Sequence, residues 1–150
     1  VNVSSTLGTL SGNSYSEALK DRFRKAASEG GKPEQVDELM QEFVDGAQYG
    51  SLAKSGWTTE KNADSISASL AYNVSKSGLS ALTQALHNQH AGKQNIEWSS
   101  CCPGYVKTDL TRGGGFLTVD QGAKTPVKLA LDDVLPEGGF WRQEKPAEWM

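Results

Sequence analysis

The order in which strand-like and helix-like patterns follow one another constrains the fold of this chain most. A β-branched run at residues 1–5 precedes a series of helical patterns; a short alternating stretch at 95–102, another helix and an apolar run at 138–141 come later. Strands separated by helices pair in parallel, because a parallel connection needs a crossover of about a dozen residues. We therefore predict an α/β fold with a parallel sheet and flanking helices.

Two helical patterns lie between the first strand and the longest helix. In each, apolar residues recur every three or four positions and so share one face of a helix. The first face contains Leu19, Phe23, Ala26 and Ala27, and the second contains Val36, Leu39, Met40, Phe43 and Val44, after Pro33 in a first turn. Residues 51–67 have the composition of a loop, in which Trp57 could serve as an anchor.

The longest helical signal runs over residues 67–90, and a further helix follows the second strand. Leu70, Val74, Leu82 and Leu86 are expected to form the core stripe of the long helix, with Ala81 and Ala85 as small packing residues. The sequence Thr-Val-Asp-Gln at 118–121 has the capping-box pattern and predicts the start of the last helix.

Composition excludes several classes of partner. The net charge of −3 comes without a basic cluster, which argues against nucleic acid or an anionic membrane surface. No apolar stretch approaches the roughly 20 residues that span a bilayer. Cys101 and Cys102 are adjacent, where a disulfide would be strained, so we expect free thiols in a reducing compartment, the cytoplasm. His87 and His90 have no further ligand at matching spacing, and we predict no metal site.

Tyr72 and Lys76 form the first candidate for chemistry. Four residues apart on a helix, they project from one face about one turn apart. A cation beside a phenol stabilises the phenolate and lowers its pKa from about 10, which makes the phenol a better proton donor. Ser4 and Ser5, at the end of the preceding strand, are the candidates for a hydroxyl that holds a substrate carbonyl.

Three motifs in a fixed order make a catalytic role for Tyr72 and Lys76 more specific than the pair alone does. Asn-Val-Ser-Ser ends the first strand, Tyr-Asn-Val-Ser-Lys lies on the long helix, and Cys-Cys-Pro-Gly-Tyr-Val-Lys-Thr-Asp at 101–109 ends the next strand. Alone, a Tyr and a Lys four residues apart are more often a half-buried Tyr and a solvated Lys. The ordered set resembles the short-chain dehydrogenase/reductase family. This resemblance covers essentially the whole chain and implies the C-terminal half of a Rossmann-type parallel sheet.

The resemblance also implies roles for individual residues. Ser5 would hydrogen-bond the substrate carbonyl, with Ser4 on the opposite face of its strand, and Tyr72 would be the general acid in a reduction by NADPH. Lys76 would assist Tyr72 and bind the nicotinamide ribose. The residues implied to contact the cofactor are Tyr72, Lys76, Pro103, Gly104, Val106 and Thr108. Tyr105 would line the substrate pocket; Cys102 would line it too, unless it is only a small buried residue.

The long segment between Ser5 and Tyr72 indicates which members of the family the chain resembles most. It implies a helical insertion, at about 11–66, that is typical of carbonyl reductases and covers the face other members use for dimers. The parent would then be a monomer acting on quinones, aldehydes or ketones. A steroid, prostaglandin or polyol dehydrogenase of the same family remains an alternative, as does a truncated, non-catalytic binding module.

The Gly-rich turn that binds the cofactor in this family is absent, and residues 113–115 do not replace it because they follow no strand. A mobile loop over the site is the expectation for these glycines. Residues 1–150 are therefore expected to form a partial Rossmann-type reductase domain, its catalytic half. We expect this chain alone to be inactive, and its sequence does not distinguish NADPH from NADH.

Overall fold

The computed structural model describes residues 1–58, 67–91, 96–132 and 139–150. These residues form short strands, one 3-10 helix and longer α-helices. In chain order they are β1 (Asn2–Val3), η1 (Thr6–Gly8), α1 (Glu17–Ala26), α2 (Pro33–Gln48), α3 (Ala68–His90), β2 (Ser100–Cys102), α4 (Val119–Leu131), β3 (Phe140–Arg142) and β4 (Lys145–Ala147).

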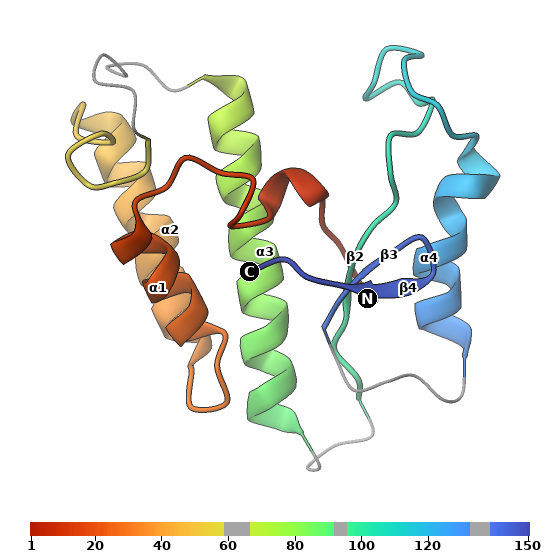
Figure 1. The fold of residues 1–150 in the computed structure, drawn as a ribbon, viewed down its shortest axis with the longest axis horizontal. Helices are drawn as coiled ribbons and strands as arrows, with labels where there is room; N and C mark the ends of the chain where they lie inside the picture. The colour runs from red at the N-terminus through yellow and green to blue at the C-terminus, as the bar shows by residue number, and fades with distance from the viewer. Residues whose placement is uncertain (59–66, 92–95, 133–138) are drawn as a thin grey trace.

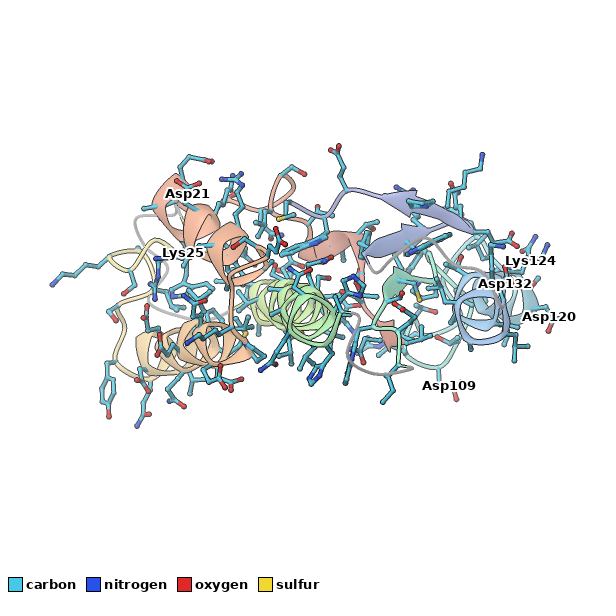
Figure 2. All side chains as sticks on the ribbon, turned by 90° about the horizontal axis from the view of Figure 1, so that it is seen from below. Asp21, Lys25, Asp109, Asp120, Lys124 and Asp132 are labelled. Carbon is cyan, nitrogen blue, oxygen red and sulfur yellow. The ribbon has the colours of Figure 1, made fainter. Side chains whose placement is uncertain are left out.

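The sheet confirms the predicted α/β architecture. Its strands run in the order β1-β2-β3-β4, and β1, β2 and β3 are parallel while β4 pairs with β3 antiparallel. Helix α3 covers one face and α4 the other, and α1 and α2 pack on the far side of α3 (Figure 1). Viewed along the helices, α1 and α2, then α3, the sheet and α4 lie in a row (Figure 2). Charged side chains of both signs lie at the two ends of this row.

Adjacent residues of β2 point to opposite faces of the sheet, as strand geometry requires. Cys101 joins Leu129 of α4 and Trp141 in one buried cluster. Cys102 joins Phe140 in the larger cluster on the α3 side. Both thiols are buried and free, as expected for adjacent cysteines.

The two helices predicted between β1 and α3 exist, as α1 and α2, and pack around an aromatic cluster. Trp57 is fully buried and its ring meets those of Tyr15, Phe23 and Phe43 at centroid distances of 5.8, 6.0 and 5.1 Å, each nearly edge-on. Edge-to-face contacts of this kind are favourable beyond their burial. Trp57 therefore anchors the loop after α2, as its sequence position indicated. Residues 59–66, the end of the expected insertion, lie outside the described residues.

The core stripe expected for α3 is partly wrong. Val74 is buried, and Leu70 and Leu82 are partly buried and pack against the core, as expected. Leu86 is also only partly buried and is not part of this core cluster. The most buried positions of this helix carry small side chains, and they are Ser77, Gly78, Ser80, Ala81, Thr83 and Ala85. The reason is that α3 is packed between the sheet and helices α1 and α2, and close approach on both sides leaves room only for small residues.

Other element boundaries also differ from expectation. β1 covers only Asn2–Val3, because Ser5 already caps η1; β2 begins at Ser100, and Asn95 of the expected strand is not described. Val44 was assigned to the buried face of α2, but it is 53% exposed. The antiparallel strand β4 was not predicted.

Two buried groups make the fold sensitive to alkali. Burial raises the pKa of the Tyr15 hydroxyl from 10.0 to about 12, against the opposing effect of its hydrogen bond with Ser77. Burial, reinforced by Cys102, raises the pKa of the Cys101 thiol from 9.0 to about 11. The unfolded chain therefore loses both protons at lower pH than the folded chain. The stability that these groups contribute is complete below about pH 9 and is lost as pH rises to about 12.

We expect the melting temperature to fall over this range, with a shallower fall above pH 10 in Tyr15→Phe, which has no phenol to ionise. Thermal unfolding followed by circular dichroism at each pH measures this. Tyr49→Phe is the matched control, since Tyr49 is 74% exposed, and should follow the wild type. Equal slopes in all three proteins would contradict the assignment to Tyr15.

Candidate active site

Ser4 and Ser5 at the end of β1 have different surroundings. Ser4 Oγ donates to the Lys76 carbonyl oxygen at 3.1 Å and lies 2.8 Å from Ser80 Oγ, so its hydroxyl is committed to α3. Ser5 Oγ accepts a hydrogen bond from the Leu7 amide at 3.1 Å and thereby caps η1. A hydroxyl that accepts still has its own proton to donate. Of the two, Ser5 has a donor to offer to a carbonyl oxygen.

Tyr72 and Lys76 lie together on the first half of α3. The Lys76 ammonium is 5.6 Å from the centroid of the Tyr72 ring, within the range of a cation–π contact. It also donates to the Val3 carbonyl oxygen at 2.9 Å, which leaves two of its three donors. Tyr72 is 38% exposed, and no residue that the structure describes hydrogen-bonds its hydroxyl. The phenol is thus accessible from solvent and close to a cation.

The loop after β1 is held tightly against α3. Ser77 Oγ donates to the Gly8 carbonyl oxygen at 2.9 Å. A Cβ on Gly8 would lie 2.6 Å from the Lys76 carbonyl carbon, closer than packed atoms come, so this position needs glycine. The contact fixes the segment that follows Ser5 against the helical turn of Lys76.

The chain after β2 leaves the sheet at the same edge as the loop of Ser5, because β1 and β2 are parallel. Gly104 has a φ of +86°, and a Cβ there would lie 2.6 Å from Leu117 Cδ1. Beyond it, Val106 bridges to Leu117, and the segment folds back on itself. Pro103 is half-buried, whereas Gly104 and Thr108 are exposed. These are the positions that the family resemblance assigns to the cofactor.

Thr111 organises this returning loop, and sequence reasoning did not identify it. Its Oγ1 is within hydrogen-bond distance of the carbonyl oxygens of Val106, Thr108 and Gly114, at 2.8, 3.0 and 2.7 Å, and accepts from the Thr108 amide at 3.0 Å. The triple glycine at 113–115 therefore lies in a closed turn whose centre is a hydroxyl. A Thr in an irregular stretch, here between Leu110 and Arg112, has no sequence signal that would have revealed this role.

The two residues expected in the substrate pocket lie at different depths. Tyr105 is 51% exposed, and its ring meets that of Phe116 at 5.6 Å, nearly edge-on. Cys102 is buried, with its sulfur 3.7 Å from Thr6 Oγ1. Phe116 is more exposed than Tyr105, so together these rings present aromatic surface beside the loop.

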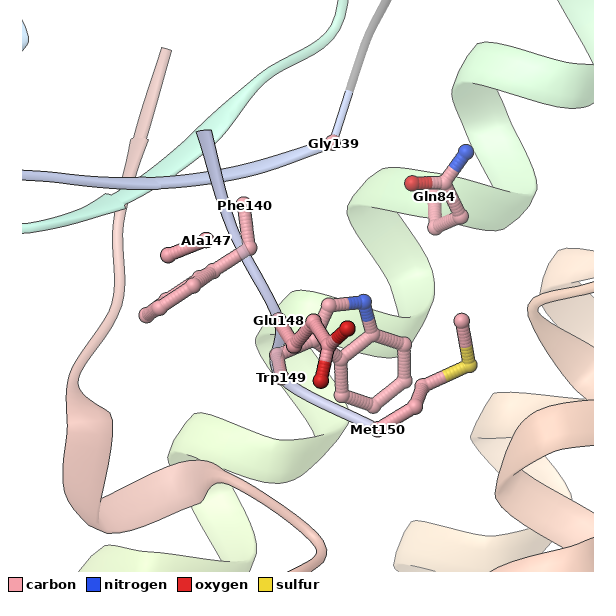
Figure 3. A pocket seen from close by; sticks show the side chains of 7 residues that line it. All are labelled: Gln84, Gly139, Phe140, Ala147, Glu148, Trp149 and Met150. Carbon is pink, nitrogen blue, oxygen red and sulfur yellow. The ribbon is translucent and has the colours of Figure 1, made fainter. Parts of the chain in front are cut away.

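One hollow among the described residues does not coincide with these side chains. It measures about 440 Å³ and lies between α3 and the C-terminal segment (Figure 3). Its lining consists of Gln84, Gly139, Phe140, Ala147, Glu148, Trp149 and Met150. Gln84 is 12 residues beyond Tyr72, or roughly 18 Å along the helix axis. None of the residues that carry chemistry lines this hollow, and we do not assign the active site to it.

Two further observations concern metals and membranes. Within residues 1–58, 67–91, 96–132 and 139–150, no three His, Cys, Asp or Glu side chains are grouped as metal ligands. His87 Nδ1 instead lies 3.6 Å from a Glu97 carboxylate oxygen, and His90 stacks on Trp98. Of the helices in the described ranges, none has the length and apolar character needed to cross a bilayer.

Known proteins resemble this chain in sequence and in fold. A family model described as short chain dehydrogenase matches residues 59–114. NADPH carbonyl reductase 3 of Rattus norvegicus is 37% identical across 99% of this chain and 51% of its own length. Short-chain dehydrogenase/reductase 1 of Saponaria officinalis is 36% identical across 97% of this chain and 44% of its own.

A solved structure agrees with the sequence matches. Salutaridine reductase from Papaver somniferum superposes with a TM-score of 0.75 at 26% identity, covering 94% of this chain and 43% of that one. The chain spans about half the length of the curated relatives it matches. Its parallel sheet with flanking helices corresponds to half of a Rossmann-type fold. The chain belongs to the short-chain dehydrogenase/reductase family, and carbonyl reductases resemble it along its whole length.

Proposed function

We propose that residues 1–150 are the catalytic half of a reductase domain, and that the protein containing them reduces quinones, aldehydes or ketones with NADPH. The observation that carries the proposal is the exposed Tyr72 phenol beside the Lys76 ammonium, on a helix that is locked against the loop of Ser5. The similarity to carbonyl reductases supports the substrate class and the choice of NADPH.

The described residues fit the nicotinamide end of this cofactor. Two donors of Lys76 are left after its bond to Val3, enough for two ribose hydroxyls. Gly104 presents bare backbone where the chain leaves β2, which is where open α/β sheets bind their ligands. Tyr72, Pro103, Val106 and Thr108 complete the proposed contacts. When bound, NADPH supplies a hydride to the carbonyl carbon.

The protein's own residues would complete the reduction at the carbonyl oxygen. The Ser5 hydroxyl donates a hydrogen bond to this oxygen, and the bond that Ser5 already accepts from Leu7 strengthens its donor. As the π bond of the carbonyl opens, the Tyr72 hydroxyl gives its proton to the oxygen. The Lys76 ammonium stabilises the negative charge left on the phenol oxygen. Exchange with solvent through the exposed side chain then restores the proton.

The aromatic surface of Tyr105 and Phe116 supports planar, apolar substrates such as quinones. Cys102 would lie at the inner end of this pocket, behind Thr6. Steroids, prostaglandins and polyols are the alternative substrates. Turnover of one of these compounds, without turnover of quinones or simple aldehydes, would favour that alternative.

Removing the Tyr72 hydroxyl tests the proposed acid. We expect Tyr72→Phe, made in the complete protein, to lower kcat for a quinone or aldehyde by at least about a hundredfold, because a positioned general acid contributes that much or more. NADPH oxidation measured by absorbance reports the rate. Tyr49→Phe, on the exposed end of α2, is the matched control and should retain the wild-type rate. A fully active Tyr72→Phe protein would rule out the proposed mechanism.

The isolated chain provides a second test. We expect residues 1–150 alone to show no NADPH oxidation with quinone or aldehyde, because the described residues provide no Gly-rich turn for the pyrophosphate. The longer protein that contains this sequence, assayed in parallel, should be active. Turnover by the purified 150-residue chain would show that the half-domain suffices.

A further inference from the structure

We propose that Asn13 is a positioning residue: its carboxamide holds the loop after β1, and with it Ser5, in register with the turn of α3 that carries Tyr72. Nothing in the family resemblance assigns a role to this residue. The inference rests on the proposed function, since it concerns the alignment of the two groups that would contact the carbonyl oxygen.

Asn13 is buried and uses its side chain completely. Nδ2 donates to the carbonyl oxygens of Leu7 and Thr9, at 2.9 and 2.7 Å, and Oδ1 accepts from Asn73 Nδ2 at 2.9 Å. Only 8% of the residue is exposed, although it lies in a loop of polar residues. A buried carboxamide with both donor hydrogens and its acceptor engaged has one orientation, and it constrains each group that it contacts.

The groups on the two sides of this carboxamide are the ones that bear the chemistry. On the loop side, the same Leu7 whose carbonyl accepts from Asn13 donates its amide proton to Ser5 Oγ. On the helix side, Asn73 is the residue next to Tyr72 in α3. The carboxamide therefore joins Leu7, the residue whose amide orients the Ser5 hydroxyl, to the helical turn that presents the phenol.

Another contact holds the middle of the loop but cannot replace this one. Ser77 Oγ fixes Gly8 one turn further along α3. That bond sets the distance between loop and helix, whereas the bonds from Asn13 to Leu7 and Thr9 hold the chain on either side of Gly8. Two points of attachment are needed to stop the loop from pivoting about the first.

Only an amide of this length fits the three partners. Two carbonyl oxygens require two donor hydrogens, and the Asn73 amide requires an acceptor. Aspartate offers acceptors alone and would place a charge against two carbonyl oxygens. Alanine removes the partner of three polar groups, the carbonyl oxygens of Leu7 and Thr9 and the side-chain amide of Asn73.

The test uses the complete protein and two variants that break the link from opposite ends. Asn13→Ala removes all three bonds, and Asn73→Ala removes only the bond to α3, a milder change that retains the loop contacts. For Asn13→Ala we expect kcat per folded molecule to fall about tenfold, because small misplacements of reacting groups are costly. The KM for NADPH should stay within about twofold, since Lys76 is held by α3 itself. Asn73→Ala should show a smaller loss in the same direction.

Asn88→Ala is the matched control. Asn88 also lies on α3 and also donates its side-chain amide to a carbonyl, that of Ala27 at 3.0 Å, but near the far end of the helix. It should lose stability without losing kcat. If the rates per folded molecule of Asn13→Ala and Asn73→Ala equal that of Asn88→Ala, the positioning role is refuted.

Amide hydrogen exchange separates failure of this proposal from failure of the proposed function. Exchange at residues 6–9 should accelerate in Asn13→Ala and Asn73→Ala, and not in Asn88→Ala, whether or not the wild type reduces carbonyl compounds. If the wild type is inactive but this exchange pattern holds, the link exists and the proposed chemistry is wrong. Unchanged exchange in all variants would overturn the link itself.

Discussion

The contact between the loop after β1 and helix α3 determines the geometry of the candidate site. Gly8 lies so close to the backbone of Lys76 and Ser77 that even a methyl group would collide, and Ser77 Oγ bonds the Gly8 carbonyl. A helix that slid by one residue would move about 1.5 Å and break both features. The positions of Tyr72 and Lys76 along the helix axis, relative to the loop of Ser5, therefore depend first on this close packing of the backbone.

Hydroxyl and amide groups, rather than large apolar side chains, continue this contact along β1. Ser4 bonds Ser80, and Asn2 Nδ2 donates to Thr83 Oγ1 at 2.9 Å. Apolar packing tolerates small shifts, but a buried hydrogen bond loses its full value when its partner moves away. These hydrogen bonds accordingly hold α3 in a single register on β1. The side chain of Val3, on the opposite face of β1, is exposed, and its residue contacts α3 through the carbonyl that accepts from Lys76.

Sequence patterns predicted the elements better than the contacts between them. The capping box at Thr118 and the first-turn Pro33 marked two helix starts, because these signals depend only on neighbouring residues. Of the buried small residues of α3, Ala81 and Ala85 were expected, but Ser77, Gly78, Ser80 and Thr83 were missed. Hydropathy favours leucines, whereas burial here follows from how closely two layers approach. Asn13 and Thr111 were missed because each satisfies carbonyl groups of its own loop, and no periodicity marks such positions. The motif spacing still predicted that Tyr72 and Lys76 would share a helix face.

The bond from Lys76 to Val3 connects the site to the state of the sheet. The amides of Asn2 and Ser4 donate to β2, so the intervening Val3 directs its own amide and carbonyl to the opposite edge of β1. Unpaired edge groups of this kind favour a further strand, and a lysine is one way to cover them. A strand that paired with β1 on this side would need the carbonyl that Lys76 now occupies. Without its bond to Val3, the Lys76 ammonium would have all three donor hydrogens available for other partners. The position of the Lys76 side chain therefore depends on whether a further strand covers this edge of the sheet.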